Sequence, residues 1–577
     1  MTGLLERLQK SKLVAWGFDT GKPRRLPLTI FTVLLLTGFV GAAQTGLFDR
    51  DEPRNAQAAL EMIRSGDWLV PTFNGEPRLH KPILIYWLMA ASYQLLGENA
   101  LAARLPSILA GAGAGVLVYV FAARWFTRRE AVWAIVVWAT LPLTLVESRM
   151  ATTDSLLNLL ILGMMLSLGR LYQSPSPHSA RMFWLLLGLS TLTKGPVAIM
   201  PIAGALIFTK YATGVAIAWR WFRPLEGLVI VSAVVLPWLA AVTMATDGEF
   251  LRFAVGRELL GRTIRPVEGH WGLPGYYLGM LPVMFFPWIA FLPMALKGAW
   301  TQRKTDPRIA FLLGWAVLPL VPLELMATKL VHYHYPSYAA LAILVAREIC
   351  RLEKLNTRPN LLAGGRLVRG SLISLMSIAA ALFLGFAWVG SWRVSLGSLL
   401  AAFLLVNGLR FMIPAVQAGA WRKLFPALAL NWSAVIVITL GWVLPASQRG
   451  AMSHQVAARL NQLSGELQAA AILGEYREPS VIYNLRSPNP VQISRSLADI
   501  RRIVRQTGAV VMPVLADDRA IMQKADDLEL KMVGEVRAFD FQQGRRRTVG
   551  LALVSLKAEE RLAMIRELSD PPTKLQR

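Results

Sequence analysis

Long apolar runs, separated by short polar or basic stretches, fill the first 445 residues of the chain. A bilayer crossing needs roughly 17 to 25 mostly apolar residues, and many of these runs approach or reach that length. They lie near residues 26–47, 82–97, 104–123, 130–147, 154–172, 181–193, 195–211, 225–246, 275–296, 308–326, 334–350, 370–390, 394–413 and 424–445. The pattern predicts a polytopic α-helical membrane protein.

The composition agrees with this interpretation and excludes other classes of protein. Hydrophobic residues make up 54% of the 577 residues and charged residues 17%, with a mean hydropathy of +0.44, which is too apolar for a soluble multidomain protein. The formal net charge is +25, but the basic residues form short clusters between apolar runs, where they set membrane orientation. Nucleic-acid binding is therefore not expected. The single cysteine, Cys350, excludes intramolecular disulfides.

The distribution of the basic clusters decides how the segment 82–97 is interpreted. If this segment does not cross the membrane, all clusters fall on one side, which the positive-inside rule identifies as the cytoplasm. The clusters are Arg24 and Arg25; Arg124, Arg128 and Arg129; Arg170 and Arg181; Arg220 and Arg223; Arg303, Lys304 and Arg308; Arg351, Lys354, Arg366 and Arg369; and Arg422 and Lys423. We therefore expect an interfacial helix at 82–97, about 13 crossings and a cytoplasmic segment 1–25. A short tilted crossing at 82–97 is the alternative.

The domain organisation follows from this topology. Residues 26–445 form a transmembrane domain with an outer loop 48–103, and an odd number of crossings places residues 446–577 outside the cytoplasm. This tail alternates helical pattern with short β-rich segments, which is typical of a small α/β domain. The β-rich segments are "AAILGEY", "SVIYNL", "GAVVMPVL" and "TVGLALVSL". The tail contains no recognisable motif, so a structural or docking role is favoured.

Charged residues gather in the outer loops, where charge at membrane level is costly and tends to mark function. In the first loop, "EPRNAQAALEMIRSGDW" has apolar residues at helical spacing, with Pro53 in the first turn. Asp51 or Glu52 could cap this helix, and a catalytic role is the competing interpretation of Asp51. Arg54 belongs to the same stretch. Further on, "RLHKP" places Lys81 at the level of the lipid headgroups, where a snorkelling lysine is the alternative.

Two later outer segments and one loop contribute further candidates. "ESRMATTDSLL" places Asp154 at the start of a crossing, either as a reactive carboxylate or as a helix N-cap. "TKGP" supplies Lys194 at a tight turn between two short crossings. The loop 247–274 is rich in arginine, and the forked guanidinium group of arginine suits phosphate binding. The alternative is that this loop forms a solvated amphipathic helix. The arginines of that loop are Arg252, Arg257, Arg262 and Arg265.

The segment "TKLVHYHYPSY" brings Lys329 and Tyr333 to the same outer face. His332 and His334 form an H-x-H arrangement that could bind a divalent metal with nearby carboxylates, but the sequence fixes no third ligand. No Gly-rich loop follows a strand, so neither a nucleotide site nor a required cofactor is predicted. Independently of the residues, an enzyme that acts outside the cytoplasm has little access to nucleotide sugars, so a sugar donor there would have to arrive on a lipid.

These motifs, in this order, resemble the membrane-embedded GT-C glycosyltransferases of the protein-mannosyltransferase type. Among them, the bacterial 4-amino-4-deoxy-L-arabinose transferases that modify lipid A are the most similar. The matching stretches are "DRDEPRNAQAALEM", "RLHKPILIYWL", "ARLPS", "RMATTDSLL", "LTKGP" and "TKLVHYHYP". The resemblance implies a GT-C fold with interfacial helices in the first outer loop.

The resemblance also implies a reaction and a set of site residues. A sugar of the aminoarabinose type would pass from an undecaprenyl-phosphate-linked donor to a phosphate of lipid A, at the periplasmic face of the bacterial inner membrane. The implied carboxylates are Asp51 and Asp154, and the implied substrate contacts are Lys81, Lys329 and Tyr333. The further candidates for the lipid phosphate are Arg54, Arg257 and Arg262.

Two alternatives to this function remain open from the sequence. A GT-C transferase could use a protein hydroxyl or another glycolipid as the acceptor. A transporter of lipid-linked sugars also has many crossings, but it would place charges near mid-membrane and break its helices at corresponding points of two halves. The charges here gather at one face and no internal repeat is visible, so a transferase is favoured over a transporter. We expect it to act as a monomer.

Overall fold

The computed structural model of the chain describes residues 25–48, 50–264, 271–355, 365–389, 391–448, 451–487, 489–494, 496–515, 525, 527–540 and 545–560. Contacts between these residues define two compact units. The first unit contains the chain up to Thr45, Asp67–Pro71 and Arg78–Pro445, and the second contains Gly46–Gly66, Thr72–Pro77 and the chain from Ala446. The predicted N-terminal segment up to residue 24, as well as Arg265, lies outside the described residues.

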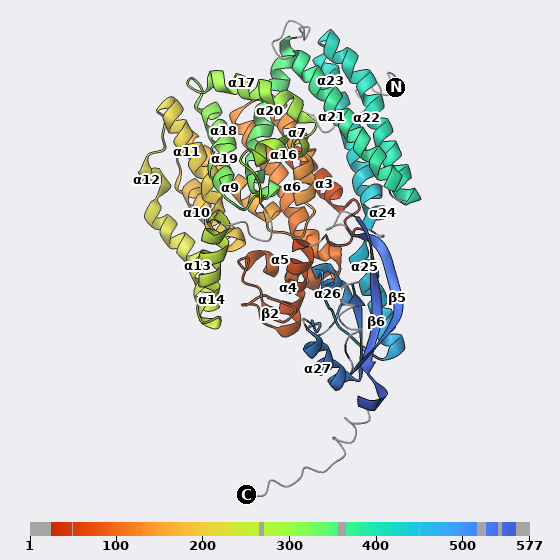
Figure 1. The fold of residues 1–577 in the computed structure, drawn as a ribbon. Coiled ribbons are helices and arrows are strands. Elements are labelled where there is room, and N and C mark those ends of the chain that lie inside the picture. The colour runs from red at the N-terminus through yellow and green to blue at the C-terminus, as the bar shows by residue number, and fades with distance from the viewer. Residues whose placement is uncertain are drawn as a thin grey trace. The chain divides into compact units, whose positions relative to one another are not determined.

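The first unit is a bundle of helices (Figure 1), and every apolar run predicted from the sequence contains helix. The N-terminal half contains α3 (Arg25–Phe39), α5 (Leu84–Leu96), α6 (Ala100–Trp125), α7 (Arg128–Ala139), α8 (Pro142–Glu147), α9 (Asp154–Gln173), α10 (Pro177–Lys194), η1 (Pro196–Ala198), α11 (Ile199–Thr213), α12 (Trp219–Phe222) and α13 (Pro224–Ala245). The following part contains α14 (Glu249–Leu251), η2 (Arg252–Gly261), α15 (Arg262–Ile264), α16 (Tyr276–Met284), η3 (Trp288–Phe291), α17 (Leu292–Gln302), α18 (Pro307–Val317) and α19 (Leu320–Leu325). The last part contains η4 (Val331–Ser337), α20 (Tyr338–Leu355), α21 (Gly365–Val389), α22 (Trp392–Ala418), α23 (Trp421–Ile438), η6 (Thr439–Val443) and α24 (Leu444–Gln448).

Among the described residues, 8 helices are long and apolar enough to cross a membrane, or up to 9 if one bent pair counts as a span. The bent pair is the predicted segment 275–296, in which Tyr276–Met284 and Trp288–Gln302 meet at 115°. Pro282 and Pro287 lie at this bend, and proline removes a backbone donor from a helix. The chain is a multi-pass membrane protein. A total of about 13 crossings stays a prediction from the positive-inside rule.

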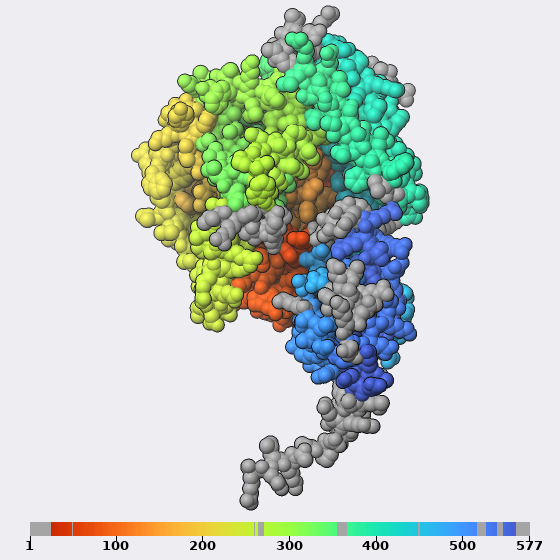
Figure 2. All heavy atoms as spheres, in the orientation of Figure 1, coloured from red at the N-terminus to blue at the C-terminus, as the bar shows by residue number. Residues whose placement is uncertain are grey.

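Three neighbouring helices show why these segments suit a bilayer. The helix α22 packs against α21 on one side and α23 on the other, and their side chains cover one continuous part of the surface in Figure 2. Large apolar side chains on this surface are exposed, including Phe386, Trp388, Trp392 and Phe403. Because lipid tails solvate such a surface and tryptophan prefers the membrane interface, this face fits contact with lipid.

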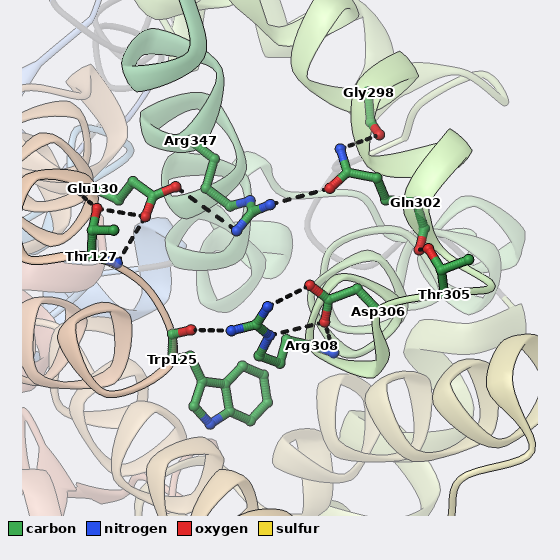
Figure 3. A network of polar contacts seen from close by, with 9 residues as sticks. All are labelled: Trp125, Thr127, Glu130, Gly298, Gln302, Thr305, Asp306, Arg308 and Arg347. Atoms are coloured by element: carbon green, nitrogen blue, oxygen red, sulfur yellow. Dashed lines mark hydrogen bonds and ion pairs between the residues drawn. The ribbon is translucent and has the colours of Figure 1, made fainter. Parts of the chain in front are cut away.

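A network of charged side chains joins three helices at one end of the bundle (Figure 3). Arg347 of α20 lies 3.8 Å from Glu130 of α7. Arg308 of α18 binds Asp306 and also donates to the backbone oxygen of Trp125 at 2.7 Å. None of the residues in this network lines the cavity described below.

The second unit contains a four-stranded sheet in the order β3-β4-β6-β5. Its strands are β3 (Ala470–Ala471), β4 (Ala509–Val514), β5 (Leu528–Asp540) and β6 (Arg545–Leu556), and its helices are α25 (Met452–Leu467), α26 (Pro479–Leu485) and α27 (Leu497–Thr507). Strand β3 is parallel to β4, and the other pairs are antiparallel. The prediction of a strand at "SVIYNL" is wrong, because this segment forms α26. Pro479 begins that helix, and Val481 and Leu485 bury one face of it.

The predicted helix of the first outer loop is confirmed as α4 (Asp51–Ser65), followed by β1 (Thr72–Phe73) and β2 (Glu76–Pro77). Its N-cap is Arg50, so neither Asp51 nor Glu52 occupies the predicted capping position. Glu52 instead accepts a hydrogen bond from the Phe48 amide at 2.8 Å. Of this loop, Gly46–Gly66 and Thr72–Pro77 belong to the second unit, where the Asn74 side-chain amide exchanges two hydrogen bonds with the Val491 backbone, whereas Asp67–Pro71 and the part from Arg78 onward belong to the first unit.

Candidate functional site

The first unit contains a cavity of about 450 Å³ with two chemically different parts. Much of its wall is apolar and comes from helices such as α9, α11, α13 and α14. The apolar residues include Leu157, Ile161, Val197, Met200, Val235, Leu239, Leu251 and Leu323. The charged side chains of the lining are Lys81, Asp154, Lys194, Glu258 and Arg262, and its polar side chains include His80, His332 and Tyr333.

A buried ion pair between Asp154 and Lys194 lines this cavity. Asp154 is the first residue of α9 and Lys194 the last residue of α10, and the Lys194 Nζ lies 2.5 Å from the Asp154 Oδ1. Only about a tenth of each side chain is exposed. The N-cap of α9 is Thr153, so the predicted alternative role of Asp154 as an N-cap is wrong. Two helix ends are thus joined through opposite charges at one end of the bundle.

The turn after Lys194 explains the "TKGP" motif. Gly195 has φ 74° and ψ −157°, a combination that essentially only glycine adopts. Pro196 then begins η1, where its missing N–H is not needed. This sharp turn ends α10 at the lysine and places the ammonium group beside Asp154.

His332 and Tyr333, at the start of η4, face the same ion pair. The His332 Nδ1 is 3.8 Å from the Glu147 Oε1, and its Nε2 is 4.0 Å from the Asp154 Oδ1. The Lys194 ammonium lies 5.2 Å from the centroid of the Tyr333 ring, within cation–π range. Asp154 therefore has a lysine and a histidine close by, and the histidine also lies near a second carboxylate.

A second ion pair, between Glu258 and Arg262, lies on the same side of the cavity. The Arg262 guanidinium donates to both Glu258 oxygens at 2.8 and 3.1 Å and to the Tyr333 hydroxyl at 3.2 Å. Burial alone would raise the pKa of Glu258, but the Arg262 hydrogen bonds and the positive charges of Lys81 and Arg262 lower it below its ordinary value. Burial lowers the pKa of Arg262, but the combined effects of Glu258 and Tyr333 raise it above its ordinary value. Both groups are therefore charged at neutral pH.

Lys81 completes the charged part of the lining. It precedes α5, lines the cavity and acts electrostatically on both Asp154 and Glu258. The cavity lining thus has three cationic side chains, two carboxylates and two histidines, His80 and His332. The net positive charge favours an anion at this end of the cavity.

Two of the predicted phosphate contacts do not line the cavity. The Lys329 ammonium donates to the carbonyl oxygens of Leu323, Glu324 and Met326 at 3.3, 2.6 and 2.9 Å, so it caps the C-terminal end of α19. Arg257 is exposed, with its guanidinium 5.3 Å from the Phe253 ring. Neither side chain is among those of the cavity wall.

The two predicted metal-binding histidines contact different groups. His334 is buried, with its Nε2 2.9 Å from the carbonyl oxygen of Ala316, whereas His332 lies near Glu147 and Asp154. The H-x-H spacing therefore does not direct both rings to one point. Within the described parts of the chain, no group of three His, Cys, Asp or Glu side chains is arranged to hold a metal ion.

The two predicted site residues of α4 belong to the second unit. Asp51 is exposed and Arg54 is half-buried on this helix. The catalytic role of Asp51 and the phosphate-binding role of Arg54 remain predictions.

Sequence reasoning missed three members of the charged arrangement. Lys194 was placed on the outer face but not assigned to the site, although a lysine directly before "GP" at membrane level pointed to it. Glu258 was not among the predicted site residues, although its i,i+4 spacing to Arg262 is the spacing of a helical ion pair. Glu147 was not predicted either, because its approach to His332 joins segments that are far apart in the sequence.

Comparisons with known proteins agree with this architecture. A family model described as dolichyl-phosphate-mannose-protein mannosyltransferase matches residues 80–243, a range that includes Lys81, Asp154 and Lys194. An undecaprenyl phosphate-α-4-amino-4-deoxy-L-arabinose arabinosyl transferase of Pseudomonas aeruginosa strain LESB58 is 29% identical over 522 residues, which cover 83% of this chain and 92% of the relative. The protein of the same name from Pectobacterium atrosepticum is 31% identical over 338 residues, covering 55% of this chain and 59% of that protein.

A solved structure shows the same fold. The crystal structure of ArnT from Cupriavidus metallidurans bound to undecaprenyl phosphate superposes with a TM-score of 0.72 at 19% identity, covering 92% of this chain and 98% of that one. The structure of the same protein in the apo state gives a TM-score of 0.71. The likeness extends over nearly the whole chain, including both units.

Proposed function

Since this chain belongs to the membrane-embedded GT-C glycosyltransferases of the protein-mannosyltransferase-like superfamily, we propose that it transfers an aminoarabinose-type sugar. The donor is undecaprenyl phosphate bearing the sugar, and the acceptor is a phosphate of lipid A. The reaction takes place at the periplasmic face of a bacterial inner membrane. The basic clusters support this location, because the positive-inside rule predicts that they face the cytoplasm.

The observation that carries the proposal is the division of the cavity into an apolar wall and a charged end. A polyprenyl phosphate has the same division, with a long hydrocarbon chain and an anionic head. The apolar wall suits the chain, and the surplus of cationic side chains suits the phosphate. Arg262 and Tyr333 already share a hydrogen bond at the charged end, so their donors are positioned before a phosphate arrives.

During transfer, the bond between the anomeric carbon and the donor phosphate oxygen breaks, and its electron pair stays on the phosphate. Lys81, Arg262 and Tyr333 stabilise this growing negative charge, which is the largest task for the site. An oxygen of the acceptor phosphate forms the new bond to the anomeric carbon. Because that phosphate is already ionised at neutral pH, no strong base is required.

The two predicted carboxylates take supporting roles in this proposal. Asp154, fixed by Lys194, places negative charge where the sugar develops oxocarbenium character. Asp51 orients the acceptor or pairs with the cationic amine of the sugar. If the acceptor were a hydroxyl, Asp51 would be its general base. An Asp51→Asn enzyme that turns over at the wild-type rate would contradict both roles of Asp51.

The function is tested on the purified full chain in nanodiscs with the lipid-linked aminosugar and lipid A. We expect a lipid A product heavier by one aminopentose, detected by mass spectrometry, and its loss in a Lys81→Met and Arg262→Gln double variant. Binding of undecaprenyl phosphate without any aminopentose product would contradict the proposed reaction. Product on a protein hydroxyl or another glycolipid would identify a different acceptor, and movement of the donor between leaflets without transfer would identify a transporter.

A further inference from the structure

The imidazole ring of His332 lies between two buried carboxylates that come from different helices. Its Nδ1 is 3.8 Å from the Oε1 of Glu147, the last residue of α8, and its Nε2 is 4.0 Å from the Oδ1 of Asp154, the first residue of α9. Both helices pack against η4, which carries His332. Because Glu147 and Asp154 are only 4% and 7% exposed, solvent does little to weaken their electrostatic interaction with the ring.

This geometry favours the doubly protonated form of the His332 ring. A neutral imidazole has one N–H donor and one nitrogen with a lone pair, whereas an imidazolium has a donor on each nitrogen. An ionised carboxylate has only acceptors. Since each ring nitrogen has a carboxylate oxygen within 4.0 Å, a neutral ring would turn its lone pair toward one of the two carboxylates in either tautomer. The imidazolium is attracted by both.

The other charged groups close to His332 belong to the site already described. Asp154 binds Lys194, whose ammonium lies 5.2 Å from the centroid of the Tyr333 ring. The remaining elements packed against η4 direct their polar groups to His334 instead, and these groups are Tyr277 of α16, the Ala316 carbonyl of α18, Glu324 of α19 and Tyr338 of α20. The charge on His332 is therefore stabilised by Glu147 and Asp154 and opposed by Lys194.

We propose that His332 is a positioning residue, whose imidazolium keeps the Asp154 carboxylate ionised and in place at the charged end of the cavity. His332 also lines this cavity. Without its charge, Glu147 and Asp154 would repel each other, so that one of them would take up a proton or move away. This inference rests on the proposed function, in which Asp154 faces the sugar as it develops oxocarbenium character. Transfer should therefore be lost at alkaline pH, when His332 releases its proton.

The charge of His332 can be measured without any assumption about the reaction. The chain has six histidines, so nitrogen NMR of the ¹⁵N-histidine-labelled full chain in nanodiscs resolves few rings, and the signals of His332 are those that His332→Gln lacks. We expect both ring nitrogens to be protonated at pH 7 and one of them to lose its proton at alkaline pH. The signal of an unprotonated nitrogen at pH 7 would overturn the proposal.

The role of the second carboxylate is tested by the same measurement on a variant. Glu147→Gln removes one negative charge beside the ring with little change of shape, so His332 should release its proton at a lower pH than in the wild type. Glu324→Gln is the matched control, because Glu324 acts on His334, and it should leave the titration of His332 unchanged. Equal titrations of His332 in Glu147→Gln and in the wild type would show that the ring does not join the two carboxylates.

The positioning role is tested by turnover. We expect His332→Gln to lower kcat roughly 10-fold or more and to abolish the fall of kcat at alkaline pH, while the affinity for undecaprenyl phosphate changes far less. His332→Lys keeps a positive charge over this range, so it should recover part of kcat and also lack the alkaline fall. A kcat and a pH profile of His332→Gln equal to those of the wild type would refute the positioning role.

A second histidine of η4 separates the loss of charge from a loss of structure. His334 contacts the Ala316 carbonyl rather than a carboxylate, so His334→Gln should lower the melting temperature and keep the alkaline fall of kcat. Loss of that fall in His334→Gln as well would assign it to the fold and not to His332. Absence of sugar transfer by the wild type would contradict the proposed function instead, and the NMR titrations would still decide whether His332 joins Glu147 to Asp154.

Discussion

The ammonium group of Lys194 lies 2.5 Å from the carboxylate of Asp154, in an environment where about nine tenths of each side chain is buried. The pair joins the last residue of α10 to the first residue of α9 and lines the same cavity as Arg262 and Tyr333. Two buried charges of opposite sign stabilise each other only while both are present. The pair therefore links the geometry of the site to the stability of the bundle.

Removal of one partner of this pair is expected to destabilise the protein strongly. Lys194→Met leaves a buried carboxylate without its lysine, which costs about 3 to 5 kcal/mol of the free energy of unfolding. We expect a marked fall in melting temperature together with loss of sugar transfer. The double variant Lys194→Met with Asp154→Asn removes both charges, so it should recover most of the stability but none of the transfer. Wild-type transfer by the double variant would show that the pair is only structural.

Arg262 is expected to control the affinity for a lipid phosphate. Hydrogen bonds to charged groups contribute about 1.5 to 3 kcal/mol, so Arg262→Gln should weaken the binding of undecaprenyl phosphate roughly 10- to 150-fold, measured by titration in nanodiscs. Arg347→Gln is the matched control, because Arg347 also pairs with a glutamate but belongs to a network that does not line the cavity. Equal affinities of the two variants would remove Arg262 from the phosphate site.

The positions of the helices could be predicted from the sequence because a bilayer imposes a length and a hydrophobicity on every crossing. The bend of 115° within 275–296 was not predicted, although its two prolines were visible. A run of apolar residues shows that a segment is buried in the membrane, but not whether it runs straight. The same limit explains α26, where a short β-rich stretch could not be distinguished from a helix by its pattern.

Residues of the site could be predicted only where they belong to a local sequence motif. Asp154 and Tyr333 stand in recognisable motifs, and both line the cavity. The partner of Asp154 could not be predicted, because Lys194 is 40 residues away and reaches it through packing of α9 against α10. Lys329 was expected at the phosphate because the resemblance to the transferase family implied it, but its side chain binds the backbone of α19.

Lys329 and Lys81 are expected to respond in opposite ways to the same substitution. Lys329→Met leaves carbonyl oxygens of α19 without their donor, which costs about 1 to 3 kcal/mol and lowers the melting temperature, while the affinity for undecaprenyl phosphate stays unchanged. Lys81→Met should lower that affinity with a smaller effect on melting. The two measurements on both variants decide which lysine serves the phosphate, and a loss of affinity in Lys329→Met alone would reverse the assignment.

Glu258 is expected to make the stability of the protein sensitive to acid. Its folded pKa lies below the ordinary value of 4.5, so its contribution to stability is complete above pH 4.5 and is lost as the pH falls through the folded pKa. The difference in melting temperature between the wild type and Glu258→Gln should therefore be constant from neutral pH to about pH 5 and shrink below pH 4.5. A difference that grows on acidification would show that the fold raises this pKa.

Gly195 is expected to hold Lys194 in place through its backbone conformation. At φ 74° and ψ −157°, an alanine costs about 1 to 3 kcal/mol, and relief of this strain would move the adjacent ammonium group away from Asp154. Gly195→Ala should therefore lower both the melting temperature and kcat. Gly214 ends α11 in the left-handed region at φ 72° and ψ −9°, where alanine also costs about 1 to 2 kcal/mol, so Gly214→Ala should lower the melting temperature without changing kcat. If both variants lose stability and keep kcat, the turn after Lys194 has no influence on transfer.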